Sequence, residues 1–572
     1  MSDFLWKIGG EAGAGIMTTG LSFAKIASRL GYHVIDFVEY PSLIRGGHNS
    51  YEVRVADEKV GALKKEVDCL VCLNEDTFRR HRQRLTPSSY VIYDEADFAV
   101  QGEFIKIAVP FKKILSESKG SPVMMNMLAL GASLAVIGAD LDIVNDIIQE
   151  QFADKDQTIV DLNQKFAGLG FNYVKTNYQT LVKTLLPKKN EEKKMVLTGN
   201  DAFSLASVVA DCRLFAAYPM TPASSVLTTL AAWQEKTGMI VRHSEDEIAV
   251  INTALGSSFA GVRSAIATSG GGFALMVEAL SFAGVAEIPL VVFLAQRPGP
   301  ATGMPTWTEQ GDLLFAVNAG HGEFPKIVLA PGDVAEMIEL TAKAFDLADV
   351  YQLPVIILSD MYLSESHQTY PIKGFNDFTA SYRVNRGKLV NQPSESKYLR
   401  YKVTDDGISE RLVPGTSGYF YQANSYEHLE DGHSTEDAAE RVKQVEKRER
   451  KRITYLKQDF QPAKIYGDMA AATVVFVSWG STKGPIIEAQ KILDRKRVKS
   501  AFIHFTHLYP LEKDKIRPLF SQGKRYVLVE NNYSGQFGKL LRAEAGIELN
   551  DQILKYNGRN FYPEEISEKL FK

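Results

Sequence analysis

The feature that most constrains this chain is an alternation of short apolar runs with stretches of helical pattern. Between Phe4 and about Pro187 the runs FLWKIGG, HVIDFVEY, CLVCL and YVIYD alternate with stretches such as TTGLSFAKIASRLG. The rhythm returns between about Val196 and Gln368, with IPLVVFLA and LPVIILSD, and again from Ala471, with TVVFVSWGS. Alternation of this kind is typical of βαβ units, which place a parallel sheet between helices. The pattern predicts an α/β protein with three sheet-containing units, whose sheets are parallel or mixed.

A chain of 572 residues is also too long for one hydrophobic core, so several domains are expected. The charged segment LPKKNEEKKM has almost no apolar content and reads as a linker, and the region that ends in EDAAERVKQVEKRERKRITYLKQ has the pattern of an amphipathic, charge-laced helix. The expected divisions are a first unit at 1–186, a linker at 187–195, a second unit at 196–368, an inter-domain arm at 369–468 and a third unit at 469–572.

Composition narrows the class of function. The net charge of -4 and the pI near 6.3 provide no basic field for nucleic acid or an anionic membrane. No window approaches the ~20 apolar residues that span a bilayer, and the glycine-broken start does not read as a signal peptide. We therefore expect a cytoplasmic protein with small-molecule chemistry. Three cysteines are too few for a disulfide framework or a four-thiolate cluster in this chain.

Two motifs of the first unit have ordinary structural interpretations. Four glycines between a strand and a helix could hold an anion or form a tight turn, and no ligand is assigned to them (Gly9, Gly10, Gly13 and Gly15). The segment EYPSLIRGGHNSYEVRV carries Arg45, His48 and Asn49, and we favour a hairpin at a subunit interface.

Two possible metal or redox motifs also favour structure over chemistry. Cys69 and Cys72 have C-x-x-C spacing but lie in the apolar run VDCLVCL, where thiols act as small buried hydrophobes. His428 and His433 lie among carboxylates in EHLEDGHSTED, without a second ligand cluster. A core strand and a solvated loop are the respective predictions.

The second unit carries the more specific motifs. In AAYPMTPAS, Pro219 and Pro222 interrupt regular structure and hold Thr221 between them at a strand end. In HSEDEIAVINTALG, an acidic start leads into an apolar helix and places Glu245 or Glu247 near its N-terminus, where compensation of the helix dipole is the simplest role.

Two glycine-containing turns complete this set. IATSGGGFALM joins a strand to a helix through glycines that allow close approach to the backbone. In LAQRPGPATGMPTWTEQGD, a strand is followed by a loop that contains one cation, Arg297, and the hydroxyls of Thr302 and Thr306. This loop is favoured as a carboxylate-binding site over a purely structural loop.

These motifs resemble the alpha subunits of 2-oxoacid:ferredoxin oxidoreductases, in the arrangement that fuses a gamma-like domain ahead of the alpha part. The likeness extends over nearly the whole chain and depends on the motifs RGGHNS, YPMTP, TSGGGFALM and QRPGPATGMPT and on the PGT, EH and GH of the arm. Within the family, the sequence most resembles the 2-oxoglutarate enzyme. The resemblance implies a pyrimidine-binding domain for thiamine diphosphate in the middle and a transketolase C-terminal-like domain at the end.

The same resemblance suggests roles for individual residues. Tyr218, Pro219, Thr221 and Glu247 would contact the cofactor, and Arg297 with Thr306 and Thr221 would bind the substrate carboxylate. Counted back from the TSGGG turn, the cofactor-activating acid falls on Glu247 and not on Glu245. In such enzymes a buried glutamate on the aminopyrimidine lets the cofactor act as its own base.

Parts that this chain lacks are expected on a partner. A convincing G-D motif followed by an acceptor pair for diphosphate and Mg²⁺ is missing, and ENNYSGQFG, with Asn531 and Asn532, reads as an interface turn. The likeness implies a beta subunit with the Mg²⁺ site and the iron-sulfur cluster, an active site between chains, ferredoxin and coenzyme A as reaction partners, and a dimer of alpha-beta pairs.

Three alternatives remain open at this point. The substrate could be pyruvate or a branched-chain 2-oxoacid, or the chain could belong to a thiamine-dependent decarboxylase without redox chemistry. It could also be a scaffold or regulatory subunit. The presence of Thr221, Glu247 and Arg297 together argues against the non-enzymatic alternative.

Overall fold

The computed structural model describes residues 3–42, 47–182, 192–521 and 523–571. It confirms the predicted α/β class with three sheets. The chain divides into two compact units, each described separately below. The first comprises the chain up to Leu197 together with Glu365–Phe378 and Tyr562–Glu568, and the second comprises the rest. Among the described residues, no helix combines the length and the apolar character that crossing a membrane requires.

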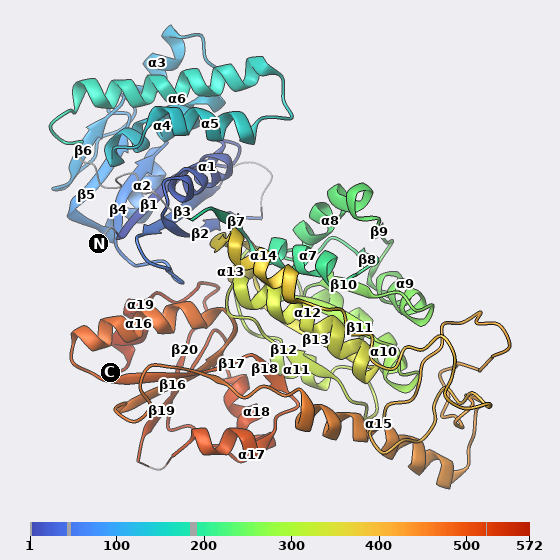
Figure 1. Ribbon diagram of the computed structural model, residues 1–572. Helices are drawn as coiled ribbons and strands as arrows, with labels where there is room; N and C mark the ends of the chain where they lie inside the picture. The colour runs from blue at the N-terminus through green and yellow to red at the C-terminus, as the bar shows by residue number, and fades with distance from the viewer. Residues whose placement is uncertain (1–2, 43–46, 183–191, 522, 572) are drawn as a thin grey trace. The chain divides into compact units, whose positions relative to one another are not determined.

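The first unit is built on an eight-stranded sheet in the order β6-β5-β4-β1-β3-β2-β14-β7 (Figure 1). Its strands are β1 (Asp3–Glu11), β2 (His33–Glu39), β3 (His48–Ala56), β4 (Val67–Cys72), β5 (Leu85–Tyr93), β6 (Ile105–Ala108), β7 (Lys194–Leu197) and β14 (Gln368–Pro371). Its helices are α1 (Ile16–Arg29), α2 (Glu75–His81), α3 (Phe111–Glu117), α4 (Met125–Ile137), α5 (Leu141–Gln151) and α6 (Gln157–Asn177).

The sheet of this unit is mixed, which is within the predicted parallel or mixed class. Strands β1, β4, β5 and β6 are parallel, whereas β3 runs antiparallel to both β1 and β2. Strand β2 ends at Glu39 and β3 begins at His48, and antiparallel neighbours need no crossover helix. This pair is the predicted hairpin, and its place at a subunit interface stays a prediction. Arg45 lies outside the described residues, and His48 lies on β3 with its Nε2 2.8 Å from Nε2 of His81.

The core of this unit is centred on α4, which is apolar on every side and fully covered. Two glycines allow α4 and α6 to pack closely: a Cβ at Gly131 would lie 1.8 Å from the carbonyl oxygen of Ala167, and one at Gly170 would lie 2.0 Å from that of Leu128. Cys69 and Cys72 are buried in β4, as predicted, and burial raises the pKa of both thiols. They act as core residues.

The glycine cluster at the start of the chain forms a turn. Gly9 and Gly10 belong to β1, and Gly13 and Gly15 follow it with φ angles of 91° and 74°, a region that favours glycine. Gly15 is the N-cap of α1. The last residues of the expected linker, from Lys194, belong to β7, while 183–191 lie outside the described residues.

The second unit contains a seven-stranded sheet in the order β18-β12-β13-β11-β10-β8-β9. Its six strands from β12 to β9 are parallel, and β18 pairs antiparallel with β12. The strands are β8 (Leu214–Ala217), β9 (Ile240–His243), β10 (Ser264–Thr268), β11 (Leu290–Gln296), β12 (Ile327–Leu329), β13 (Pro354–Asp360) and β18 (His507–Tyr509). The helices around this sheet are α7 (Gly199–Val209), α8 (Ser224–Thr237), α9 (Glu247–Phe259), α10 (Gly270–Val285), α11 (Leu313–Asn318), α12 (Val334–Tyr351) and α13 (Met361–Glu365).

The same unit contains a five-stranded sheet in the order β15-β17-β16-β19-β20. Its strands are β15 (Lys464–Tyr466), β16 (Val474–Trp479), β17 (Ser500–Phe505), β19 (Arg525–Glu530) and β20 (Asp551–Leu554). The remaining helices of this unit are α15 (Ala438–Gln458), α16 (Lys483–Arg495), α17 (Lys513–Ile516) and α18 (Gln536–Ala545). Helix α19 (Pro563–Lys569) falls almost entirely in the first unit, as do the first seven residues of α14 (Ile372–Ser381).

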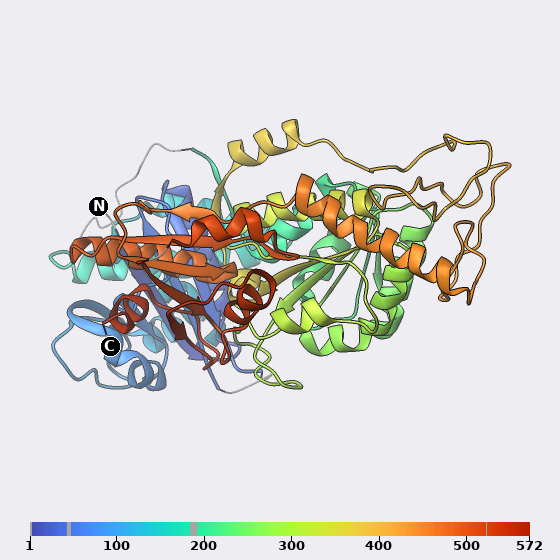
Figure 2. The same cartoon turned by 90° about the horizontal axis from the view of Figure 1, so that it is seen from below.

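Between α14 and α15 the chain follows an irregular path with only isolated β-bridges (Figure 2). The predicted charge-laced helix is present as α15. The expectation of a solvated loop is wrong for His428, which is buried: its ring nitrogens lie 3.1 Å from the carbonyl oxygens of Leu429 and Val285, and its ring packs on Tyr401. His433 is exposed. Among the described residues, no group of three or more His, Cys, Asp or Glu side chains could hold a metal ion.

Candidate active site

The predicted site residues gather at one edge of the seven-stranded sheet. Because its central strands are parallel, their carboxyl ends lie at the same edge, which is where open α/β sheets bind ligands. Tyr218 follows β8, Glu247 begins α9 after β9, and Arg297 follows β11. The structure therefore brings together motifs that are separated by as many as 79 residues in the sequence.

Glu247 and Glu245 differ in exposure. Glu247 is the first residue of α9 and its side chain is buried, whereas Glu245 is exposed. The N-cap is Asp246, whose carboxylate accepts a hydrogen bond of 2.7 Å from the amide of Ala249. Asp246 already provides a negative charge at the N-terminus of α9. Compensation of the helix dipole therefore does not explain why the Glu247 side chain is buried.

The three glycines that open α10 are explained by what lies against them. A Cβ at Gly272 would come within 2.7 Å of Glu247 Oε1, and one at Gly270 within 2.5 Å of Asp312 Oδ2. At Gly271 the nearest atom would be the carbonyl oxygen of Ala301, at 4.0 Å. The first turn of α10 is thus in contact with two carboxyl groups that come from different parts of the chain.

The loop after β8 is held by its backbone. The Thr221–Pro222 peptide is cis, and the carbonyl oxygen of Thr221 accepts a hydrogen bond of 2.8 Å from Arg297 Nη1. The carbonyl oxygen of Pro222 accepts one of 2.7 Å from Asn200 Nδ2. Within the described part of the chain the Thr221 hydroxyl has no hydrogen-bond partner, and the ring of Tyr218 is 39% exposed. Both side chains are therefore available to a ligand.

The protein provides hydrogen-bond partners for only part of the Arg297 guanidinium. Its Nη1 is bound to the Thr221 carbonyl, while its Nε is buried and unpartnered among the described residues. Burial lowers the pKa of Arg297, and nearby Asp312 partly offsets this effect. A guanidinium with unused donors is suited to bind a planar carboxylate by paired hydrogen bonds.

Two carboxyl groups near Arg297 were not identified from the sequence. Burial raises the pKa of Asp312 to about 6, and Arg297 partly opposes the rise. Burial also raises the pKa of Glu309 to about 7, and the negative charge of Asp312 adds to that rise. Both residues lie at the end of the QRPGPATGMPTWTEQGD loop. Because they are far from Glu247 in the sequence, no local pattern indicated that they belong to the same site.

The same loop is fixed by residues from the five-stranded-sheet region of this unit. Gln310 is fully buried: its Nε2 donates to the carbonyl of Trp479 at 3.0 Å, and its Oε1 accepts from the amide of Asn531 at 3.0 Å. Asn532 Nδ2 donates to the carbonyl of Gln310 at 3.0 Å. Asn531 and Asn532 thus position the loop that carries Arg297 through contacts within this chain, and their role in an interface between chains stays a prediction.

The two threonines of this loop differ. Thr306 is buried and lies next to Trp307, whose ring is covered by the guanidinium of Arg559 at 3.0 Å from its centroid. Thr302, near the tip of the loop, is exposed. The structure places Thr306 and Arg297 on the same ordered loop, and no hydrogen bond joins them in the described residues.

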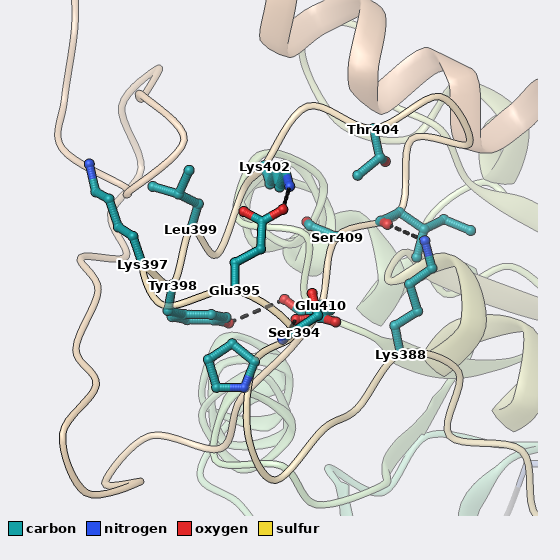
Figure 3. Close-up of a pocket in the computed structure, with 12 residues that line it drawn as sticks. Lys388, Ser394, Glu395, Lys397, Tyr398, Leu399, Lys402, Thr404, Ser409 and Glu410 are labelled. Atoms are coloured by element: carbon teal, nitrogen blue, oxygen red, sulfur yellow. Dashed lines mark hydrogen bonds and ion pairs between the residues drawn. The ribbon is translucent and has the colours of Figure 1, made fainter.

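A separate cavity of about 200 Å³ lies in the arm and is lined by lysines and glutamates (Figure 3). Its charges are matched: Lys402 is paired with Glu395, and Lys388 donates to the carbonyl oxygen of Ile408 at 2.7 Å and to Asp406. Glu410 accepts a hydrogen bond of 2.9 Å from the amide of Ser394. Groups that neutralise one another in this way provide no specific site for an anion.

Comparisons with known proteins agree with this geometry. A family model described as pyruvate flavodoxin/ferredoxin oxidoreductase, thiamine diphosphate-binding, matches residues 206–447, and one described as pyruvate ferredoxin/flavodoxin oxidoreductase matches residues 5–173. The chain is 33% identical to the alpha subunit of 2-oxoacid:ferredoxin oxidoreductase 2 of Aeropyrum pernix, over 99% of this chain and 97% of that protein. The chain belongs to this family of oxidoreductase subunits.

Other members of the family are named for one substrate. The chain is 27% identical to the 2-oxoglutarate oxidoreductase subunit KorA of Mycobacterium tuberculosis, over 99% of this chain and 91% of that protein. Its fold matches the 2-oxoglutarate:ferredoxin oxidoreductase of Magnetococcus marinus, solved with 2-oxoglutarate, coenzyme A and succinyl-CoA bound, with a TM-score of 0.91 and 30% identity over 100% of this chain and 99% of that one. The chain is therefore a subunit of a 2-oxoacid:ferredoxin oxidoreductase and contains its thiamine diphosphate-binding domain.

Proposed function

We propose that this chain is the alpha subunit of a 2-oxoglutarate:ferredoxin oxidoreductase. The reaction interconverts 2-oxoglutarate, coenzyme A and oxidised ferredoxin with succinyl-CoA, carbon dioxide and reduced ferredoxin. The observation that carries the proposal is the burial of Glu247 against Gly272 at the carboxyl edge, beside an arginine with free donors. The names of the relatives support 2-oxoglutarate as the substrate.

The residues at this edge fit the pyrimidine half of thiamine diphosphate. Glu247 offers a buried carboxylate, and Ser269 Oγ is a buried hydroxyl without a hydrogen-bond partner in the described residues. Tyr218, Pro219 and Thr221 line the adjoining loop and would hold the ring from the β8 side. Thiamine diphosphate held by these residues would supply carbanion chemistry at the 2-oxo carbon and an electron sink for decarboxylation.

Within this scheme the residues of the chain have distinct tasks. Glu247 would hold a proton at the pyrimidine nitrogen, Arg297 would orient the substrate carboxylate by paired hydrogen bonds, and Thr306 with Thr221 would add hydroxyl contacts. The apolar walls of the sheet edge would exclude water from the reacting atoms.

The remaining parts are proposed to come from a beta subunit that carries Mg²⁺, the iron-sulfur cluster and the diphosphate half of the cofactor site. All three cysteines of this chain are buried and free. Helices α9 and α10 expose Ile248 and Leu275, 52% and 55% accessible, on a face that has no cover among the described residues. We propose that the beta subunit covers it, in a dimer of alpha-beta pairs that delivers electrons to ferredoxin.

The domain boundaries are part of the same proposal. We assign 1–186 to the gamma-like domain, 196–368 to the pyrimidine-binding domain and 469–572 to the transketolase C-terminal-like domain, joined by the linker 187–195 and the arm 369–468. The family matches at 5–173 and 206–447 support the separation of the first domain from the rest, while the second match continues across position 368 into the arm.

The first test is to purify this chain with its beta subunit without oxygen and to assay reduction of a viologen dye. With coenzyme A and thiamine diphosphate present, turnover with 2-oxoglutarate in preference to pyruvate and branched 2-oxoacids would support the proposal. A preference for another 2-oxoacid would replace the substrate assignment, and a cofactor-loaded complex inert with all of them would refute the proposed reaction.

The role of Glu247 has a matched control in the same segment. Glu247→Gln should lower kcat by about 100-fold or more, because general acid-base groups contribute this much. Glu245→Gln removes the same charge two residues away at an exposed position and should retain full turnover. Equal effects of the two substitutions would contradict the assignment.

A further inference from the structure

Asp312 occupies a position relative to α10 that matches the position of Glu247. Its carboxyl group fills the space of a Cβ at Gly270, as the carboxyl group of Glu247 does at Gly272. Gly270 and Gly272 are two residues apart in the first turn of α10. Both carboxyl groups therefore lie at the helix N-terminus, where backbone amides provide a partial positive charge. Only Glu247 is accounted for by the proposed chemistry.

The backbone of Asp312 is tied to the residue that precedes Arg297. Its amide donates a hydrogen bond of 2.9 Å to Gln296 Oε1, and Gln296 Nε2 donates one of 2.9 Å to the carbonyl of Ser359. Gln296 is fully buried. These bonds fix Asp312 relative to the end of β11, from which the Arg297 side chain starts.

The charges that face Asp312 are few. Arg297 attracts the Asp312 carboxylate, and the Asp312 charge in turn raises the pKa of Glu309 in the same loop. Helix α10 presents glycines and no charged side chain at its first turn. Within the described residues no cation lies within the 4.0 Å of an ion pair with Asp312. Asp312 and Arg297 therefore interact across a gap and not through a closed salt bridge, which leaves the remaining donors of Arg297 open.

We propose that Asp312 is a positioning residue that acts as the counter-ion of Arg297 until a substrate carboxylate takes its place. This inference rests on the proposed function, because it requires Arg297 to receive a carboxylate. When Asp312 is ionised, it and the substrate are two anions that compete for one guanidinium. When Asp312 is protonated, the competition ends and the substrate carboxylate binds more tightly.

The direction of the pH effect follows from the ionisation of Asp312. Its pKa is raised to about 6 by burial, so the group is neutral at pH 5.5 and ionised at pH 7.5. Carboxylate affinity should therefore fall as the pH rises through this range. For charges a few ångströms apart near a protein surface, a change of about tenfold in affinity is expected.

The test measures binding of 2-oxoglutarate by calorimetry to the complex of this chain with its beta subunit, depleted of thiamine diphosphate so that no turnover occurs. For the natural chain, the Kd should rise about tenfold between pH 5.5 and 7.5. Asp312→Asn should bind as tightly at pH 7.5 as at pH 5.5. Glu278→Gln, which removes an exposed charge from the same helix, should follow the natural chain.

Two results would overturn the inference: a pH dependence in Asp312→Asn like that of the natural chain, or no binding of 2-oxoglutarate at any pH. A merely structural role would weaken binding at every pH and leave the slope unchanged, which also counts against it. Glu309→Gln should keep the pH dependence with its midpoint unchanged, because Glu309, whose pKa is about 7, is still mostly neutral where Asp312 ionises. Failure of the proposed reaction is seen separately, as absence of turnover in the cofactor-loaded complex.

Discussion

The two ends of helix α10 have buried acidic groups in contrasting surroundings. Just beyond its C-terminal end, Glu287 is fully buried and its carboxylate accepts hydrogen bonds of 2.5 and 2.6 Å from Lys447 Nζ, with Lys451 as a second partner. At the N-terminal end, Asp312 has no ion-pair partner within 4.0 Å among the described residues. Although burial alone would raise the pKa of Glu287, the lysines lower it, whereas the pKa of Asp312 is raised.

This contrast separates a structural from a functional use of buried charge. At the C-terminal end the Glu287 carboxylate is held by both Lys447 and Lys451, and Arg400 Nη2 also donates to the Glu287 carbonyl at 2.8 Å. At the N-terminal end, donors of Arg297 and the Asp312 carboxyl remain incompletely matched. Unmatched groups of this kind mark candidate ligand sites, because a ligand can complete them.

The largest expected effect is on the compensated end. Lys447→Met removes the lysine that makes both short bonds to Glu287 and should destabilise the packing of α15 by about 3 kcal/mol, since breaking a buried pair leaves an uncompensated charge. Hydrogen exchange of the α15 amides should then quicken by about 100-fold. Lys443→Met, at an exposed position of the same helix, should leave exchange unchanged. Equal exchange in both variants would show that the pairing does not hold α15.

The second prediction concerns the glycines at the other end. Gly272→Ala places a Cβ 2.3 Å from Thr268 Oγ1 and 2.7 Å from Glu247 Oε1, so it should destabilise by about 1–3 kcal/mol through overpacking and reduce turnover. Gly271→Ala meets nothing closer than 4.0 Å and should stabilise by about 0.5–1 kcal/mol through helix propensity. Thermal unfolding and the viologen assay measure both effects. A destabilised Gly271→Ala would contradict this account of the turn.

Much of the fold and part of the site follow from the sequence because they depend on local patterns. Alternating runs gave the α/β class, whereas Glu247 was chosen over Glu245 from the family resemblance, and Glu247 is the buried one of the two. A mixed sheet was within the predicted class, but the position of β14 beside β2 was not predicted, because two strands far apart in the sequence leave no periodic signal of their pairing.

The missed parts of the site depend on contacts between distant segments. Gln310 is held by Asn531 and Asn532, more than 200 positions away, and Asp312 meets Gly270 through a turn of the loop that no local pattern specifies. His428 was misplaced for the same reason, because the carbonyl of Val285 that lies beside its ring belongs to another segment. Polar residues with such partners look like surface loop residues in the sequence.

The third prediction tests whether the Asp312 carboxylate, which has no ion-pair partner within 4.0 Å among the described residues, lowers the free energy of unfolding. A carboxyl whose pKa is raised from 3.8 to about 6 binds its proton more tightly in the folded state, so its contribution to stability falls as the pH rises from about 4 to 6 and stays constant above. Asp312→Asn removes this penalty and should stabilise the chain by about 1–2 kcal/mol at pH 7.5, after allowance for partial exposure. At pH 5 the gain should be smaller. Thermal unfolding at the two pH values measures the difference, and a gain independent of pH would point to a different cause.

The smallest expected effect is at the exposed pairs of the arm. Lys402 and Glu395, beside the cavity of Figure 3, are 41% and 56% exposed, and water competes for both charges. Lys402→Met should therefore leave the melting temperature unchanged in low salt and in high salt. If Lys402→Met lowered stability as much as Lys447→Met does, burial would not distinguish Glu287 from the surface pairs. The contrast between the two ends of α10 would then depend only on the number of ion-pair partners. An unchanged melting temperature would support the view that enclosure, and not ion pairing alone, gives the lysines of α15 their effect.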